Sequence, residues 1–246
     1  MDKITFKDRV IALGKGFLTL FIFYFSTLLI YYILSIFIES FNINIENFWL
    51  KNIFNSLASI ISLLLFLLIF KKQLKEDWKI YKENKQECNK IGKSYWLYGL
   101  IIMVVSNLII GTFDASGISA NEAGNRSIIT NIPIFAAISM IITGPIIEEL
   151  VFRAGFKNAF KNAKPFAIFT GLLFGLVHLL ASFDSFSDIL TNWSQLLYII
   201  PYSALGIMFG IAYFKTNTIF TTIRYHIIHN AITIGMLFLA SILALF

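Results

Sequence analysis

The sequence predicts an all-α membrane protein, a polytopic transmembrane helix bundle of about seven or eight spans with a cytoplasmic N-terminus. Hydrophobic residues make up 57% of the 246 residues and charged residues 14%. Soluble domains average about 45–50% and about 25%. Apolar runs of roughly 18 residues or more recur along the chain, each long enough to cross a bilayer. Lysine and arginine gather in alternate loops, which is typical of cytoplasmic loops.

Residues 1–129 are predicted to form an N-terminal three-span region, with spans at about 17–38, 53–70 and 95–113. The first apolar run is longer than that of a signal peptide, so we expect it to be retained as a helix. Residues 71–93, which carry eight lysines, are predicted to be a solvated cytoplasmic loop near anionic lipid.

Residues 130–246 hold the remaining spans and are expected to form one integrated membrane domain with the N-terminal region. The fourth span covers about 131–160 and contains a pair of glutamates, and the next two cover about 166–182 and 195–214. The last apolar stretch, 218–246, would be about 43 Å long as one helix, whereas a bilayer core is roughly 30 Å thick. It is either one tilted helix or two pieces broken near its middle.

The positive net charge of +6 arises from the basic loops, so it indicates membrane topology and not a nucleic-acid partner. The chain has one cysteine, Cys88, which excludes an intramolecular disulfide and a cysteine-based metal cluster.

The glutamate pair, Glu148 and Glu149, lies inside an apolar segment, where an acidic side chain costs about 2.5–3.5 kcal/mol to insert. All three histidines of the chain, His178, His226 and His229, also lie within predicted spans. Polar side chains retained at this cost indicate a functional site inside the membrane.

Counting residues from the predicted cytoplasmic ends of the spans places three of these side chains at a similar depth. Glu148 and His178 are each 13 residues from such an end, or about 20 Å along a helix. His226 is 10 residues from the preceding cytoplasmic turn, or about 15 Å. We therefore expect three separate helices to bring a carboxylate and two imidazoles together.

Spacing within the motifs predicts different roles for neighbouring residues. Glu149 and Arg153 are four residues apart on one helix face, which favours an ion pair. Glu148 points elsewhere and is the freer carboxylate, suited to act as a general base. His226 and Asn230 share a face and form a candidate pair of hydrogen-bond donors, while the role of His229 is left open.

Two hydrolytic chemistries fit this set. A carboxylate and an imidazole can deprotonate a water while the second imidazole and the carboxamide stabilise an oxyanion, and no cofactor is then needed. Alternatively Glu148, His178 and His226 could hold a zinc ion that activates the water. The usual His-Glu-x-x-His zinc-protease motif is absent from the sequence.

Several small or rigid residues are expected to shape the helices around the site. Gly171 and Gly175, one helical turn apart, predict close packing of the fifth span. Phe174 is expected to pack beside the site. Gly144 and Pro145 predict a helix kink just before the glutamates, with room for a substrate backbone.

The motifs Glu148-Glu149-x-x-x-Arg153, Phe174-x-x-x-His178 and His226-x-x-x-Asn230 resemble those of the CPBP family of CAAX-protease and bacteriocin-processing (Abi) intramembrane proteases. The match covers roughly residues 130–235, so residues 130–246 are interpreted as a CPBP-like catalytic core. The resemblance implies an endopeptidase in which Glu148 and His178 activate water and His226 and Asn230 form the oxyanion hole.

The resemblance leaves the chemistry open, because members of the family are described both as glutamate proteases and as metalloproteases. It implies membrane lipid and a membrane-associated peptide or protein as partners, bacteriocin processing or self-immunity as roles, and the bacterial cytoplasmic membrane as location. The alternatives are a non-catalytic scaffold or immunity factor that binds a peptide or kinase, and a proton-coupled transporter. The substrate and the oligomeric state are left open.

Overall fold

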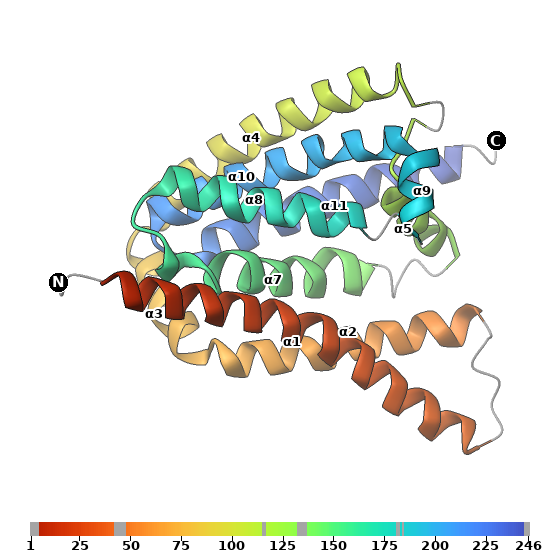
Figure 1. The fold of residues 1–246 in the computed structure, drawn as a ribbon, viewed down its shortest axis with the longest axis horizontal. Coiled ribbons are helices and arrows are strands. Elements are labelled where there is room, and N and C mark those ends of the chain that lie inside the picture. Colours follow the sequence, from red (N-terminus) through yellow and green to blue (C-terminus); the bar gives the residue numbers. More distant parts are fainter. Residues whose placement is uncertain are drawn as a thin grey trace.

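The computed structural model describes residues 5–41, 48–114, 117–131, 137–180, 183 and 185–243, and every regular element in these ranges is a helix. The N-terminal region contains α1 (Phe6–Glu39), α2 (Phe48–Ile69), α3 (Lys71–Glu83), α4 (Lys85–Ile110) and α5 (Ala120–Asn131). The C-terminal region contains η1 (Ala137–Thr143), α7 (Gly144–Glu148), η2 (Glu149–Ala154), η3 (Lys157–Ala159), α8 (Ala163–Leu180), α9 (Phe186–Thr191), η4 (Trp193–Tyr198), α10 (Ile199–Thr216) and α11 (Ile219–Leu243). The long helices run roughly along one direction, with α3 at one end of the bundle and α5 and α9 at the other (Figure 1).

The chain is a multi-pass membrane protein. Within the described residues, five helices are long and apolar enough to cross a membrane: Phe6–Glu39, Trp49–Ile69, Lys85–Ile110, Ala163–Leu180 and Trp193–Thr216. Large apolar side chains on their outer faces, such as Leu28, Leu68 and Leu108, are 66–71% exposed, as expected of side chains that contact lipid tails. The expected total of seven or eight spans and the cytoplasmic N-terminus remain predictions.

The lysine-rich segment 71–93 is helical, so its prediction as a loop is wrong. It forms α3 and the first turns of α4, and Asp77, Tyr81 and Cys88 face inward at helical spacing. The lysines occupy the outer face, which explains why charge alone suggested a loop. The segment between the predicted fifth and sixth spans also contains a helix, the short α9.

The last apolar stretch is one unbroken helix, α11, over its described part. At 25 residues it is about 37 Å long, which suits a tilted crossing of a bilayer. Its predicted end, residues 244–246, and the predicted start of the fourth span, residues 132–136, lie outside the described residues.

Hydroxyl pairs hold η1 against α2. The side chains of Ser56 and Ser139 are hydrogen-bonded at 3.0 Å, and those of Ser59 and Thr143 lie 3.3 Å apart. Within a bilayer, helices associate through packing and such polar contacts because lipid tails are as apolar as the helix surfaces. The N-terminal region therefore helps to position the helix that carries the glutamates.

Close packing of α8 against α10 is confirmed. A Cβ atom on Gly171 would lie 2.5 Å from the backbone nitrogen of Ile207, and one on Gly175 would lie 3.0 Å from the Ile199 carbonyl. Both glycines are therefore needed for the two backbones to approach, which sets His178 close to α10.

The end of the bundle near α3 contains a group of polar residues, which we call the capping cluster: Gln73, Asp77, Lys157, Tyr213, Asn217 and Thr218. Asp77 Oδ2 accepts a hydrogen bond from the Ile219 backbone N–H at 2.7 Å, and the Asp77 carbonyl accepts one from the Thr218 hydroxyl at 2.8 Å. Asp77 thereby caps the first turn of α11. Burial raises the pKa of Asp77, opposed by the Ile219 hydrogen bond and the Lys157 charge.

Lys157 occupies the other side of the capping cluster. Its ammonium group donates to the Asn217 side chain and lies 4.3 Å from the centre of the Tyr213 ring. Asn217 adopts a left-handed conformation (φ 55°) that ends α10, and Gln73 donates to the Tyr213 hydroxyl at 2.7 Å. Burial lowers the pKa of Lys157 from 10.5 to about 8, opposed by the Asp77 charge.

Candidate active site

The helix that carries the glutamates changes its backbone hydrogen bonding twice. The residues of η1 and η2 form π-helical turns, and the short α-helix α7 lies between them. Pro145 occupies the start of α7, where its missing N–H suits a break in the regular pattern. The expected kink at Gly144 and Pro145 thus corresponds to a change from π to α geometry. Such π-turns are frequent at functional sites.

The predicted ion pair between Glu149 and Arg153 is confirmed. Arg153 Nη1 lies 3.2 Å from Glu149 Oε1, and both side chains are fully buried. Arg153 Nη2 also donates to the Gly206 carbonyl at 3.2 Å, and the guanidinium lies 4.7 Å from the centre of the Phe174 ring. Surrounded in this way, the arginine supplies the positive charge that a buried carboxylate requires.

Glu148, by contrast, faces a pocket and is 21% exposed. Its Oε1 lies 3.9 Å from His178 Nε2 and its Oε2 lies 3.5 Å from His226 Nε2. The structure therefore brings together the three side chains that were expected at one depth. Both distances exceed those of ordinary hydrogen bonds.

The hydrogen bonds on the far side of each imidazole assign its proton. His178 Nδ1 lies 2.9 Å from the Phe174 carbonyl, which can only accept a hydrogen bond, so Nδ1 carries the proton. His226 Nδ1 lies 2.9 Å from Glu149 Oε1, which accepts in the same way as part of an ion pair. In the neutral rings, both Nε2 atoms then present lone pairs toward Glu148. This arrangement favours a proton-bearing group between the carboxylate and the rings.

Aromatic rings hold His178 in place. Phe174 lies beside the site as expected, with its ring centre 4.2 Å from that of His178. Tyr202 of α10 packs on His178 at 5.0 Å, with the two rings only 27° from parallel. The imidazole is thus fixed by contacts from two helices.

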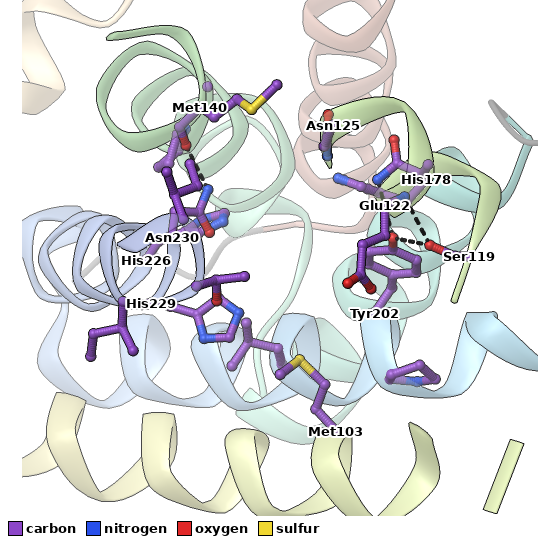
Figure 2. A pocket seen from close by; sticks show the side chains of 18 of the residues that line it. Met103, Ser119, Glu122, Asn125, Met140, His178, Tyr202, His226, His229 and Asn230 are labelled. Carbon is purple, nitrogen blue, oxygen red and sulfur yellow. Dashed lines mark hydrogen bonds between the residues drawn. The ribbon is translucent and has the colours of Figure 1, made fainter. Parts of the chain in front are cut away.

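Asn230 and His229 also border the pocket, which Figure 2 shows from close by. The Asn230 amide donates to the Met140 carbonyl in η1 at 2.7 Å, so one of its two N–H bonds is engaged within the protein. The predicted role of Asn230 as an oxyanion donor depends on the other N–H. His226 and Asn230 lie on one face of α11, and their joint role stays a prediction.

The pocket has a volume of about 750 Å³, which is large enough for several residues of a peptide. It is lined by residues of α4, α5, η1, α7, α8, η4, α10 and α11, and about half of them are polar. Met236 and Val104, both on its wall, are 59% and 46% exposed at the outer surface of the bundle. A pocket that combines apolar walls with polar groups around Glu148 suits a membrane-associated peptide chain.

The donor set proposed for a metal is Glu148, His178 and His226. Zinc needs ligand atoms that converge on one point about 2 Å away, and carbonyl or carboxylate partners on the outer imidazole nitrogens are typical of such sites. The outer partners are in place here. Across the described residues, however, no three histidine, cysteine, aspartate or glutamate side chains are arranged to hold a metal ion. The residues as placed therefore do not form a zinc site.

Sequence reasoning missed pocket residues outside the motifs, among them Tyr202, Trp96 and Asn107. Tyr202 packs on His178, and its position in a long apolar span gave no signal. The Trp96 indole nitrogen and the Asn107 side-chain oxygen on α4 are buried at the pocket without a hydrogen-bond partner in the described structure. An asparagine inside an apolar span was the one available hint, because such residues cost insertion energy.

Comparisons with known proteins agree with the motifs. Residues 130–232 match the family model described as Type II CAAX prenyl endopeptidase Rce1-like. The chain is 26% identical over 196 residues to “Putative membrane peptidase YdiL” of Bacillus subtilis, covering 76% of this chain and 72% of that protein. It is 25% identical over 165 residues to “UPF0177 protein YxdF” of Lactococcus lactis, covering 64% and 83%. No solved structure matches the chain. The resemblance inferred from the three motifs is thereby confirmed.

Proposed function

Since residues 130–232 match the type II CAAX prenyl endopeptidase family, we propose that this CAAX-protease-like membrane protein is an intramembrane endopeptidase. It hydrolyses a peptide bond in a membrane-associated peptide or protein. The observation that carries the proposal is the position of Glu148 in a pocket, with each carboxylate oxygen facing an imidazole nitrogen at 3.5–3.9 Å.

In the first step, a water between Glu148 and His178 donates its protons toward Glu148 Oε1 and His178 Nε2. Both atoms are acceptors, and their separation of 3.9 Å suits a bridging water. The water oxygen attacks the scissile carbonyl, and Glu148 takes the proton that is released. The C–N bond then breaks, the proton passes to the leaving amine, and a carboxylic acid and an amine result.

His226 and Asn230 stabilise the negative oxygen that forms during attack. His226 would donate to this oxygen through Nε2 with a proton taken up from solvent before the reaction, and the buried Glu149 carboxylate at 2.9 Å from Nδ1 would balance the added charge. Asn230 contributes the amide N–H that does not bond Met140. Glu149 and Arg153 orient His226 from outside the pocket.

The substrate we favour is a peptide without a required prenyl group, processed at or within a bacterial cytoplasmic membrane. Peptide maturation or bacteriocin self-immunity would fit such a substrate. The topology we propose has seven crossings and a cytoplasmic N-terminus. Five are the apolar helices already described, and the others are the helical run from η1 to η2 and α11. The Lys-rich face of α3 then lies on the cytoplasmic side.

The experiment uses purified protein in liposomes and two fluorogenic CAAX reporter peptides of identical sequence, one farnesylated and one unmodified. Wild-type protein should cleave at least one of them. Glu148→Gln should lower the rate by about 10²–10⁴-fold, the contribution of a positioned general base. The control is Glu83→Gln, which neutralises an exposed carboxylate at the end of α3 and should leave the rate unchanged.

Full activity in folded Glu148→Gln would show that Glu148 is not the base. Comparing the membrane peptides of a deletion strain with those of a Glu148→Gln strain extends the test to the native substrate. A phenotype that survives loss of both Glu148 and His178 would favour a non-catalytic scaffold. Proton-driven solute uptake by the same liposomes would instead favour a transporter.

The glutamate mechanism and the zinc mechanism are separated by metal analysis. We expect cleavage to persist in 1,10-phenanthroline and purified protein to contain less than one zinc per chain. Stoichiometric zinc, with activity lost to the chelator and restored by zinc, would replace the glutamate mechanism by the metal one.

A further inference from the structure

Tyr202 connects the imidazole of His178 to the segment that covers one end of the pocket. Its ring packs on the His178 ring, with 5.0 Å between the ring centres. Tyr202 belongs to α10, whereas Phe174, whose carbonyl bonds His178 Nδ1, belongs to α8. The contacts from α8 fix the imidazole from within its own helix, whereas Tyr202 restrains it from α10. Figure 2 shows Tyr202 and His178 together at the pocket wall.

The Tyr202 hydroxyl bonds to the start of α5. It lies 2.7 Å from the Ser119 hydroxyl and accepts from the Asn121 amide at 3.1 Å. Ser119 in turn accepts from the Glu122 backbone N–H at 3.1 Å, so it caps the first turn of α5. One phenol therefore joins an imidazole at the proposed reaction centre to the beginning of a separate helix.

The helix α5 forms part of the pocket wall through Asn121, Glu122, Asn125 and Ile129. A chain bound in the pocket contacts this helix on one side and the Glu148–His178 pair on another. Any shift of α5 on substrate binding would be passed to the Tyr202 hydroxyl, since two hydrogen bonds join them. The Tyr202 ring would pass it on to His178.

We propose that Tyr202 is a positioning residue with two separable roles. Its ring holds His178 with Nε2 toward Glu148, and its hydroxyl couples substrate contact at α5 to that placement. This inference rests on the proposed peptidase function, because the coupling matters only if His178 takes part in the reaction.

Two substitutions separate these roles. Tyr202→Phe keeps the ring and removes both hydrogen bonds, so substrate contact at α5 no longer reaches His178 and kcat for the cleaved reporter should fall about 5-fold. Tyr202→Leu removes the ring as well, so kcat should fall about 10-fold to 100-fold through misplacement of His178. Gln195→Leu is a matched comparison, since Gln195 holds the same segment through Ala120 and Asp114, and it should behave like Tyr202→Phe.

A readout independent of activity comes from diethyl pyrocarbonate, which modifies unprotonated imidazole nitrogens. The rate of modification of His178, read by peptide mass spectrometry, should rise several-fold in Tyr202→Leu and stay at the wild-type value in Tyr202→Phe and Gln195→Leu. Folding of each variant is checked by its thermal midpoint in detergent.

The outcomes distinguish the two proposals. An unchanged His178 modification rate in folded Tyr202→Leu would overturn the positioning role, whether or not the protein cleaves a peptide. Equal kcat and KM in Tyr202→Phe and wild type would overturn the coupling through the hydroxyl. If wild type cleaves no reporter but the modification rates follow the expectation, the placement of His178 stands and the peptidase proposal fails.

Discussion

Two groups of polar residues contact α11, and they differ in how completely their polar atoms find partners. In the capping cluster, Asp77 bonds the first turn of α11 at 2.7 and 2.8 Å. About two turns further along the same helix, His226 lies 3.5 Å from Glu148, which faces a pocket. In the capping cluster, Asp77 accepts hydrogen bonds from donors at the start of α11. In the second group, the Glu148 carboxylate oxygens face the Nε2 acceptors of the two histidines.

The difference indicates that burial of polar side chains does not by itself identify a reaction site. Asp77 is buried and Lys157 is half-buried like Glu148, but their contacts stabilise the end of a helix. Glu149 and Arg153 lie next to the reaction site, but they are fully buried and pair with each other. Substitution of Glu148 should therefore lower the free energy of unfolding less than substitution of any of these residues.

The largest effect on stability is expected for Arg153→Met. It leaves Glu149 buried without its cation, which should lower the free energy of unfolding by about 3–5 kcal/mol. The matched control is Arg126→Met, which breaks the i,i+4 pair with Glu122 at an exposed position and should cost less than about 1 kcal/mol. Urea unfolding in detergent measures both, and equal losses would contradict the distinction between the pairs.

A smaller loss is expected for Asp77→Ala, which leaves the buried Ile219 N–H without an acceptor. The free energy of unfolding should fall by about 1–3 kcal/mol, while peptide cleavage below the transition temperature should continue. Asp77→Asn retains an acceptor oxygen and should recover much of the loss. Loss of cleavage in well-folded Asp77→Ala would place the capping cluster in the reaction.

The pH dependence of stability tests Lys157. Its pKa is about 8 in the folded protein and 10.5 when solvated, so the unfolded chain binds more protons between these values. Stability should therefore rise with pH from about 8 to 10.5 by this contribution. The thermal midpoint of wild type relative to Lys157→Met should increase over that range. Lys161→Met, at an exposed position in the same segment, should show no such trend relative to wild type.

The smallest effect on stability is expected for Glu148→Gln. Because Glu148 faces two acceptor nitrogens at 3.5–3.9 Å, an uncharged amide that can donate to one of them should leave the thermal midpoint unchanged or slightly higher. A large decrease, comparable with that of Arg153→Met, would mean that Glu148 is a structural residue and would remove the basis of the comparison.

Much of the candidate site was predictable because its members are separated by fixed helical distances. The four-residue spacing of Glu149 and Arg153 predicted their ion pair, which the structure confirms. Counting from the predicted cytoplasmic ends of the spans indicated that Glu148, His178 and His226 lie at a similar depth, since the rise per residue of a helix is constant. Their catalytic roles stay predictions.

The remaining features depend on which helix faces lie against each other, and spacing does not reveal this. Tyr202 reaches His178 because Gly175 lets α8 approach α10, and Asn230 reaches Met140 because η1 lies beside α11. The helix α3 was missed for a different reason. Its lysines dominate the local composition and conceal the inward-facing residues Asp77 and Tyr81.

The hydroxyl pairs between α2 and η1 have a consequence for truncated forms of the protein. The family match begins at residue 130, yet Ser139 and Thr143 find their partners at Ser56 and Ser59. A fragment that starts at the family boundary would expose these hydroxyls to acyl chains. It would also lose α2, which contacts the helix that carries Glu148 and Glu149. We therefore expect a fragment that folds on its own to include α2, well upstream of the motifs.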